Sequence, residues 1–134
     1  MNQKRIYVSG KFTGSSDEEE QENIRLACTY GKELWRIGFA ALTPHTNCNL
    51  LSQEARVLGL PYEAFLEFDL WILTFFDAIF MLPNWRDSKG AGRERALALA
   101  LKIPIFHNLN EAREWLWREQ ERVDKFTKPP REAL

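Results

Sequence analysis

Two acidic residues, Asp69 and Glu94, occupy positions from which a carboxylate could take part in chemistry. Asp69 falls on a stripe of residues at helical spacing whose other members are Tyr62, Phe65, Leu66 and Leu73. A carboxylate on the inward face of a helix is costly unless it pairs, takes up a proton or faces a cleft. A bond to nearby backbone or to an arginine would explain Asp69 structurally, but the pattern favours an acid that faces a cleft.

Glu94 follows two glycines, Gly90 and Gly92, that come directly before an alanine- and leucine-rich segment. Glycines let the main chain pass close to a ligand, and the free N–H groups at the start of a helix attract anions. Ser88 adds a hydroxyl group at the same place. Taken alone, the stretch is also typical of a plain loop before a helix, in which a first-turn glutamate is favourable.

Tyr7 lies in an expected strand, two residues before its carboxyl end, and could be either a core residue or a site residue. Lys11 in the next loop could hold a phosphate or a sugar, although loop lysines are more often solvated. His45 and His107 have no partners at the spacing of metal ligands, so no metal site is expected. The chain also lacks a Walker motif, a G-x-S-x-G elbow and a full dinucleotide fingerprint, and we expect no cofactor.

The elements that must position these residues follow from the hydrophobic pattern. Strands are predicted at residues 5–9, 39–43, 78–82 and 103–106, and helices at residues 17–37, from Pro61 to about residue 76, 93–101 and 111–125. Ser16 and Glu19 fit a capping box, and Gly38 is a natural helix stop. The helix at 17–37 is expected to bury Ile24, Ala27, Cys28, Gly31, Leu34 and Trp35. Residues 47–59 are expected to form a loop with a helical turn.

Strands that alternate with helices predict right-handed crossovers and a parallel sheet. We therefore expect an α/β fold with three layers, a flavodoxin- or Rossmann-like parallel sheet of four strands, or five, with helices on both faces. One domain is expected over residues 1–126, with a polar tail at 127–134. Ligands of such sheets bind beyond the carboxyl ends of the strands, so residues 10–16, 44–59 and 83–92 should meet at one site.

The composition limits the classes of function. The 134 residues are 45% apolar and 28% charged, with a formal net charge of −1 and no basic cluster. Such a chain offers little attraction for nucleic-acid polymers or anionic membranes. The longest apolar run, residues 70–82, is too short to span a bilayer. The two cysteines form no motif and no signal segment is evident, so a cytoplasmic protein is expected.

Several of these residues together resemble a known family. Tyr7-Val-Ser-Gly10, Asp69 eight residues before Asp77, and the spacing Ser88-x-Gly90-x-Gly92-x-Glu94 are similar to the nucleoside 2-deoxyribosyltransferase-like superfamily. That group includes nucleoside deoxyribosyltransferases and nucleoside 5′-monophosphate N-glycosidases. The wording "LPNWRDSKGAGRERALA", with the pair Pro44-His45, resembles its DUF4406 branch most, and the resemblance covers about residues 6–106.

The resemblance implies a role for each matching residue. Glu94 would be the nucleophile that attacks C1′ of the sugar, Asp69 would protonate the departing base, and Tyr7 would orient Glu94. Asp77 would cap the entry of a strand. Asp69 is expected to have a raised pKa, and Glu94 to stay charged beside helix N–H groups. Substrate-binding roles are expected for Gly10, Lys11, Phe12, Ser88, Gly90 and Gly92.

The expected ligand is a nucleoside or nucleotide, and the expected activity is N-glycosidic cleavage, with hydrolysis favoured over base transfer. The family pattern also implies a homo-oligomer. Three departures bear on the substrate: Thr13 stands where phosphate-binding relatives carry arginine, no fifth strand follows residue 106, and the C-terminal "PPREAL" differs from that of the transferases. Two other classes stay open: a non-catalytic nucleotide-binding module, and an interaction protein that uses Trp115 and Trp117.

Overall fold

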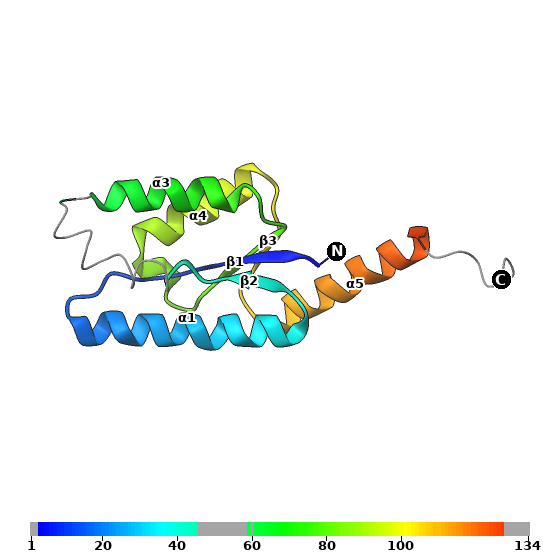
Figure 1. Cartoon of the computed structure of the whole chain (residues 1–134), viewed down its shortest axis with the longest axis horizontal. Helices are drawn as coiled ribbons and strands as arrows, with labels where there is room; N and C mark the ends of the chain where they lie inside the picture. Colours follow the sequence, from blue (N-terminus) through cyan, green and yellow to red (C-terminus); the bar gives the residue numbers. More distant parts are fainter. Residues whose placement is uncertain (1–2, 46–58, 60, 128–134) are drawn as a thin grey trace, which may run out of the picture.

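The chain alternates strands and helices, as the sequence pattern predicts. The structure, a computed structural model, describes residues 3–45, 59 and 61–127. Its elements are β1 (Arg5–Ser9), α1 (Asp17–Ile37), β2 (Ala40–Leu42), α3 (Tyr62–Leu73), β3 (Ala78–Met81), a 3₁₀ turn η1 (Trp85–Asp87), α4 (Lys89–Ala100), β4 (Ile105–Phe106) and α5 (Leu109–Thr127) (Figure 1). The expectations for residues 47–58, for the side chain of Tyr62 and for residues 128–134 lie outside the described part.

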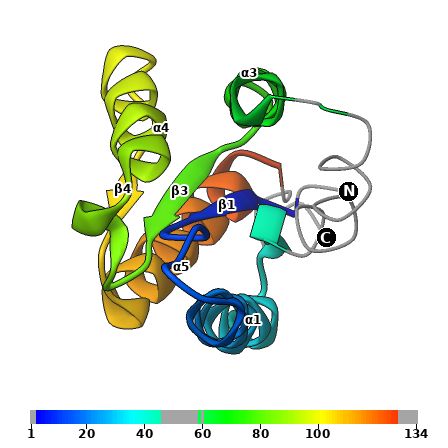
Figure 2. The same cartoon turned by 90° about the vertical axis from the view of Figure 1, so that its left-hand side faces the viewer.

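The four strands form one parallel sheet in the order β2-β1-β3-β4. Helices α1 and α5 cover one face, and α3 and α4 cover the other (Figures 1 and 2). The three-layer α/β fold is therefore confirmed, with a sheet of four strands in the described residues. The strand order reverses between β1 and β3, which is where sheets of this kind bind ligands.

The central strand β1 sends alternate side chains to the two faces. Ile6 and Val8 join the core on the side of α1 and α5. Tyr7 joins a second core on the side of α3 and α4, with Ile79 and Met81 of β3. Ser9, two residues after Tyr7, shares that second face, so β1 presents two hydroxyl groups toward α4.

Helix α1 begins and ends where the sequence predicts. The Ser16 hydroxyl accepts the backbone N–H of Glu19 at 3.1 Å, and Gly38, with φ of 125°, ends the helix. The expected inward face is wrong at one residue. Trp35 is 54% exposed, and its indole N–H donates to the carbonyl of Ala41 at 3.0 Å. The indole thereby lies over the edge of the sheet at β2.

Helix α4 begins earlier than predicted, because Ser88 is its N-cap. The Ser88 hydroxyl accepts the backbone N–H of Ala91 at 3.1 Å, which satisfies one of the free donors of the first turn. Gly90 and Ala91 are buried. The two glycines therefore belong to the helix and not to a loop at 83–92. Glycine is poor in helix interiors, and that propensity led the prediction to start the helix at residue 93.

The other boundaries differ by a few residues. Strands β2 and β4 are shorter than predicted, and α5 starts at Leu109, where the Asn108 side chain accepts the N–H of Glu111 at 2.9 Å. The expected capping role of Asp77 is confirmed, since its carboxylate accepts the N–H of Arg5 at 2.8 Å at the start of β1. The apolar run 70–82 is divided between α3 and β3. No helix in the described ranges is long and apolar enough to cross a membrane.

Gly10, directly after β1, is required by close packing. A β-carbon at this position would lie 2.5 Å from Cδ1 of Leu82 and 2.9 Å from Oδ1 of Asn84. Gly92 is the matched contrast, because a β-carbon there would meet nothing within 4 Å.

We predict that Gly10→Ala lowers the free energy of unfolding by about 1–3 kcal/mol through overpacking. Gly92→Ala should leave it unchanged or raise it by up to about 1 kcal/mol, because alanine is the better helix former. Urea unfolding followed by circular dichroism measures both. Equal stability of the two variants would contradict the packing role of Gly10.

Candidate active site

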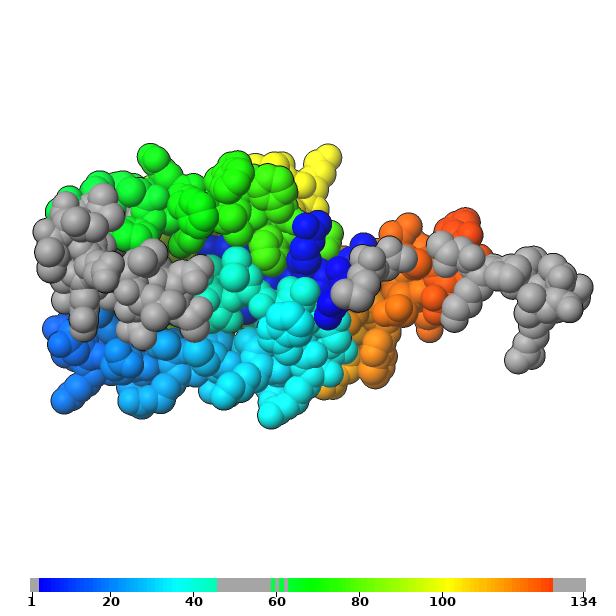
Figure 3. All heavy atoms as spheres, in the orientation of Figure 1, coloured from blue at the N-terminus to red at the C-terminus, as the bar shows by residue number. Residues whose placement is uncertain are grey.

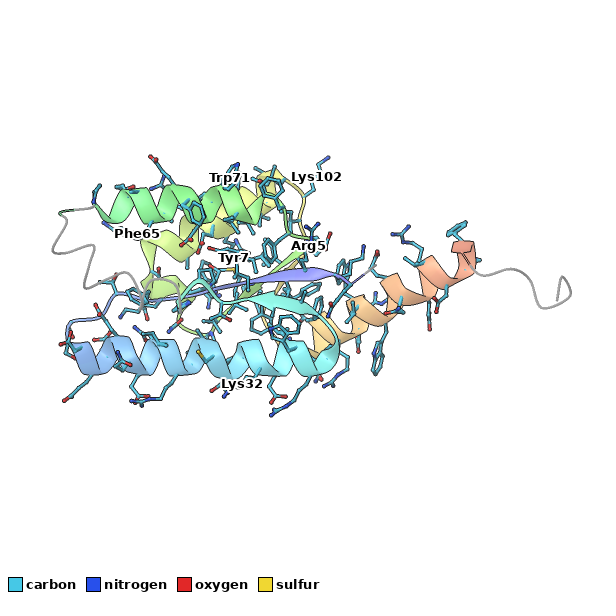
Figure 4. The ribbon with its side chains drawn as sticks, in the orientation of Figure 1. Arg5, Tyr7, Lys32, Phe65, Trp71 and Lys102 are labelled. Carbon is cyan, nitrogen blue, oxygen red and sulfur yellow. The ribbon has the colours of Figure 1, made fainter. Side chains whose placement is uncertain are left out.

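The main pocket lies at the carboxyl ends of β1 and β3, between the sheet and the pair α3 and α4. Figure 2 looks onto this edge of the sheet, and Figure 4 labels Tyr7 on β1 and Phe65 on α3, which both line the pocket. Of the residues singled out in the sequence, the pocket brings together Tyr7, Gly10, Phe12, Asp69, Ser88, Gly90 and Glu94. Segments that are far apart in the chain thus meet as the parallel fold requires.

Glu94 is the buried centre of this pocket. Its side chain projects from α4 toward β1, and only 7% of the residue is exposed. The Tyr7 hydroxyl donates to Oε2 and the Ser9 hydroxyl donates to Oε1 at 2.8 Å. Both carboxylate oxygens are thereby held by donors of one strand, which fixes the direction in which Glu94 points.

Burial raises the pKa of Glu94 to about 7. The hydrogen bonds from Tyr7 and Ser9 lower the pKa, and the nearby charge of Asp69 raises it. The expectation that Glu94 stays fully charged through helix N–H groups is therefore wrong. Because α4 starts at Lys89, Glu94 lies beyond the first turn, where the backbone N–H groups are already bonded within the helix.

Asp69 of α3 supplies the second carboxyl group of the pocket. It is partly buried, and this burial raises its pKa to about 6, in the direction that the sequence predicts. Within the described residues, Asp69 makes no hydrogen bond or ion pair with either backbone or arginine. Asp69 is one of the residues that line the pocket.

The two carboxyl groups behave as a coupled pair. Burial raises the pKa of both groups, and the charge of Asp69 adds to the shift of Glu94, so near neutral pH the two groups together hold about one proton. The hydroxyl groups of Tyr7 and Ser9 donate to Glu94. These bonds stabilise a negative charge on Glu94 over one on Asp69 once the water around Asp69 is displaced. The pocket can therefore offer one carboxylate and one carboxylic acid at the same time.

Two of the expected binding residues are not part of the pocket lining. The ammonium group of Lys11 forms an ion pair with Glu19 at 2.7 Å, at the acidic start of α1, and this pair lowers the pKa of Glu19 to about 2. The backbone N–H of Lys11 donates to Asn84. Gly92 lies on a side of α4 where the space is open.

Sequence reasoning missed Ser9 and the binding potential of His45. Ser9 could have been found from the two-residue period of β1, which places it on the same face as Tyr7. His45, just after β2, is 4% exposed and lines the pocket beside Phe12. Its Nε2 lies 3.0 Å from the carbonyl oxygen of Lys11, so Nε2 carries the proton and donates.

The remaining ring nitrogen of His45 finds no hydrogen-bond partner among the described residues. Burial lowers the pKa of His45, so the imidazole is neutral and Nδ1 carries a lone pair. This nitrogen can accept a hydrogen bond from a ligand hydroxyl or amino group. Over the described ranges, no three metal-ligating side chains gather in one place, and His45 is better explained as a polar contact than as a ligand of a metal.

The comparison with known families adds one finding. A family model described as "Domain of unknown function (DUF4406)" matches residues 4–107. The chain belongs to the DUF4406 family. No curated protein matches the chain.

The DUF4406 match runs from the start of β1 to the end of β4 and includes every residue that lines the pocket. All of α5 lies beyond it, and the last turns of α5 extend past the sheet (Figures 1 and 3). The pocket is therefore a property of the DUF4406 domain itself.

The raised pKa of Glu94 predicts a dependence of stability on pH. A carboxyl group with a raised pKa in the folded state destabilises the fold as the pH rises from its unfolded pKa, near 4.5, through about 7. We predict that Glu94→Gln raises the free energy of unfolding by about 2–3 kcal/mol at pH 8 and changes it little at pH 4.5. Urea unfolding at both pH values measures this difference.

Glu114→Gln is the matched control, because Glu114 is an exposed residue of α5 whose carboxylate pairs with Arg118 at the surface. It should show no such gain at pH 8. If Glu94→Gln behaves as Glu114→Gln does, the carboxyl group of Glu94 does not pay a burial cost in the folded protein.

Proposed function

We propose that this DUF4406 domain cleaves the N-glycosidic bond of a nucleoside or a nucleoside 5′-monophosphate, with hydrolysis favoured over transfer of the sugar to another base. The observation that carries the proposal is the pair of carboxyl groups in one pocket. Glu94 is held at both oxygens by Tyr7 and Ser9, and Asp69, with a pKa raised to about 6, pairs with no other side chain that the structure describes. The resemblance of these residues to the nucleoside 2-deoxyribosyltransferase-like superfamily supports the same chemistry.

Cleavage of the bond between C1′ and the base nitrogen passes through an oxocarbenium-like state, which two carboxyl groups in different protonation states can serve. In the first step, the Glu94 carboxylate attacks C1′ and forms an ester with the sugar. The C1′–N bond breaks, and its electron pair leaves with the base. The carboxylic acid of Asp69 gives its proton to that nitrogen, so the base departs neutral.

In the second step, water attacks C1′ of the ester. The Asp69 carboxylate takes one proton from the water, and the bond between C1′ and Glu94 breaks. The products are a free sugar and a Glu94 carboxylate, and the pair returns to its starting protonation state. A second base in place of water would give base transfer by the same route.

The difference in burial between the two carboxyl groups supports these roles. Glu94 is the more buried group and has the higher pKa. A bound substrate would cover Asp69, whose charge no donor among the described residues stabilises, and would raise the pKa of Asp69 further. Glu94 keeps the hydroxyl groups of Tyr7 and Ser9, so the proton moves to Asp69 and the nucleophile is ionised.

The sugar end of the substrate would lie against the start of α4. Ser88 and Gly90 line the pocket there, beside Gly10 from the loop after β1. The N-terminus of α4 favours an oxygen-rich or anionic group such as a 5′-hydroxyl or 5′-phosphate. No lysine or arginine belongs to the described lining, so the helix N-terminus is the main attraction for a phosphate in this part of the pocket.

We also infer that the protein forms a homo-oligomer. Phe68 and Trp71 of α3 and Phe75, just after that helix, form an aromatic face. Each of the three is more than half exposed, and the ring of Trp71 contacts the other two. Trp117 of α5 is exposed, whereas Trp115 stacks on Phe39 in the core. The observation weakens the alternative in which both tryptophans of α5 bind another protein.

The proposed activity is tested with a panel of nucleosides and nucleoside 5′-monophosphates, with free base measured by chromatography near pH 6.5. We expect base release from at least one member. Glu94→Gln should abolish it, and Asp69→Asn should lower the rate by about 10²–10⁴-fold, the usual contribution of a general acid. Circular dichroism checks that both variants are folded.

Glu114→Gln is again the matched control and should retain full activity. Full activity in Glu94→Gln would contradict the assignment of the nucleophile. Tight nucleotide binding without base release across the whole panel would instead support a nucleotide-binding module.

A further inference from the structure

A second cluster of polar side chains surrounds Trp85, outside the pocket. Trp85 opens η1 just after β3, Arg95 comes from α4, and His107 follows β4 directly. The guanidinium carbons of Arg86 and Arg95 each lie 5.0 Å from the centre of the Trp85 ring, and the His107 ring lies 6.0 Å from it. The cluster therefore lies at the carboxyl edge of the sheet, by β3 and β4 (Figure 2).

The positive charges of this cluster are not neutralised. Among the described residues, neither Arg86 nor Arg95 forms an ion pair, although the other exposed arginines of the helices commonly do. The pKa of His107 is lowered by burial and then by the charges of Arg95 and Arg86, and Glu111 is the acid that opposes them. Two guanidinium groups thus share one tryptophan, and Glu111 is the acid that acts on the neighbouring His107.

The cluster also lacks hydrogen-bond acceptors. Among the described residues, the buried Nε–H of Arg95 and Nε1–H of Trp85 find no hydrogen-bond partner. Such groups are rare in folded proteins, and each one that stays unpaired is costly. The Nε of Arg95 belongs to one of the two guanidinium groups, so the cluster offers the oxygens of an anion two cationic groups and one indole N–H.

We propose that Trp85, Arg86, Arg95 and His107 form a binding site for a phosphate group, separate from the pocket that holds Glu94. A phosphate offers three or more acceptor oxygens, which matches two guanidinium groups and an indole N–H better than the two oxygens of a carboxylate do. None of the four residues lines the main pocket. The site therefore takes either free phosphate or the phosphate of a sugar or nucleotide.

The test follows the indole N–H resonance of Trp85 by ¹H–¹⁵N NMR, without any nucleoside present. Inorganic phosphate and, in a second titration, ribose 5-phosphate are added to the full chain, with the ionic strength held constant by sodium chloride. We expect a saturable shift of the Trp85 resonance, which sodium chloride alone does not produce. A response to both ligands identifies the phosphate group as the feature recognised, and a response to one identifies its source.

Arg86→Gln and Arg95→Gln should each weaken the binding by about tenfold or more, because each removes a charged donor. Arg86 is exposed, so its replacement leaves the fold intact. Ser88→Ala, in the main pocket, and Arg113→Gln, an arginine of α5 that contacts Asn110, should leave the shift unchanged. The Ser88 variant separates this site from phosphate binding at the start of α4.

The proposal is overturned if the Trp85 resonance does not respond to either ligand. It is also overturned if both arginine variants bind as the wild type does, or if Ser88→Ala abolishes the shift. Base release plays no part in these measurements, so their outcome and the outcome of the activity assay are independent.

Discussion

The contact between Tyr7 and Glu94 is the interaction on which the site depends. It joins the central strand β1 to α4, and with the bond from Ser9 it satisfies both oxygens of a carboxyl group inside the core. A buried carboxyl group without such donors would be strongly destabilising. The pairing of β1 between β2 and β3, and the N-cap of α4 at Ser88, fix the two elements that must meet for this contact to form.

The burial that makes Glu94 costly also makes it suitable for the proposed chemistry. Its pKa near 7 and that of Asp69 near 6 place the single-proton state of the pair in the neutral range, although both carboxyl groups titrate near 4 in water. Buried carboxyl groups with raised pKa values are typical of catalytic sites, where a loss of folding stability accompanies the gain of a reactive group.

Strong periodic signals made the fold predictable from the sequence. The capped helix α1, the apolar strand β3 and the alternation of strands with helices follow from local chemistry, and they place the loops and Glu94 at one edge of the sheet. Helix α4 was predicted to start too late because helix propensity ranks glycine low. The cap at Ser88 and the burial of Gly90 outweigh that propensity.

Features that depend on neighbours in space could not be predicted in this way. The ionisation of Glu94 is governed by burial between α4 and β1, and Lys11 is drawn away from the pocket by Glu19. Nδ1 of His45 is the acceptor nitrogen because Nε2 donates its proton to the carbonyl oxygen of Lys11. The sequence contains these residues, but only the fold decides which atoms remain available.

The central claim is that Glu94 forms an ester with C1′ of a sugar, and mass spectrometry of the trapped protein tests it most directly. Fluorine at C2′ of a nucleoside slows both the formation and the hydrolysis of the ester. If the base of that nucleoside is a good leaving group, the ester forms faster than it is hydrolysed and should accumulate. The account predicts a gain of one fluorosugar per chain, located on the peptide that contains Glu94 and absent in Glu94→Gln. Release of one base per chain without a gain in mass, or a sugar on another residue, would contradict it.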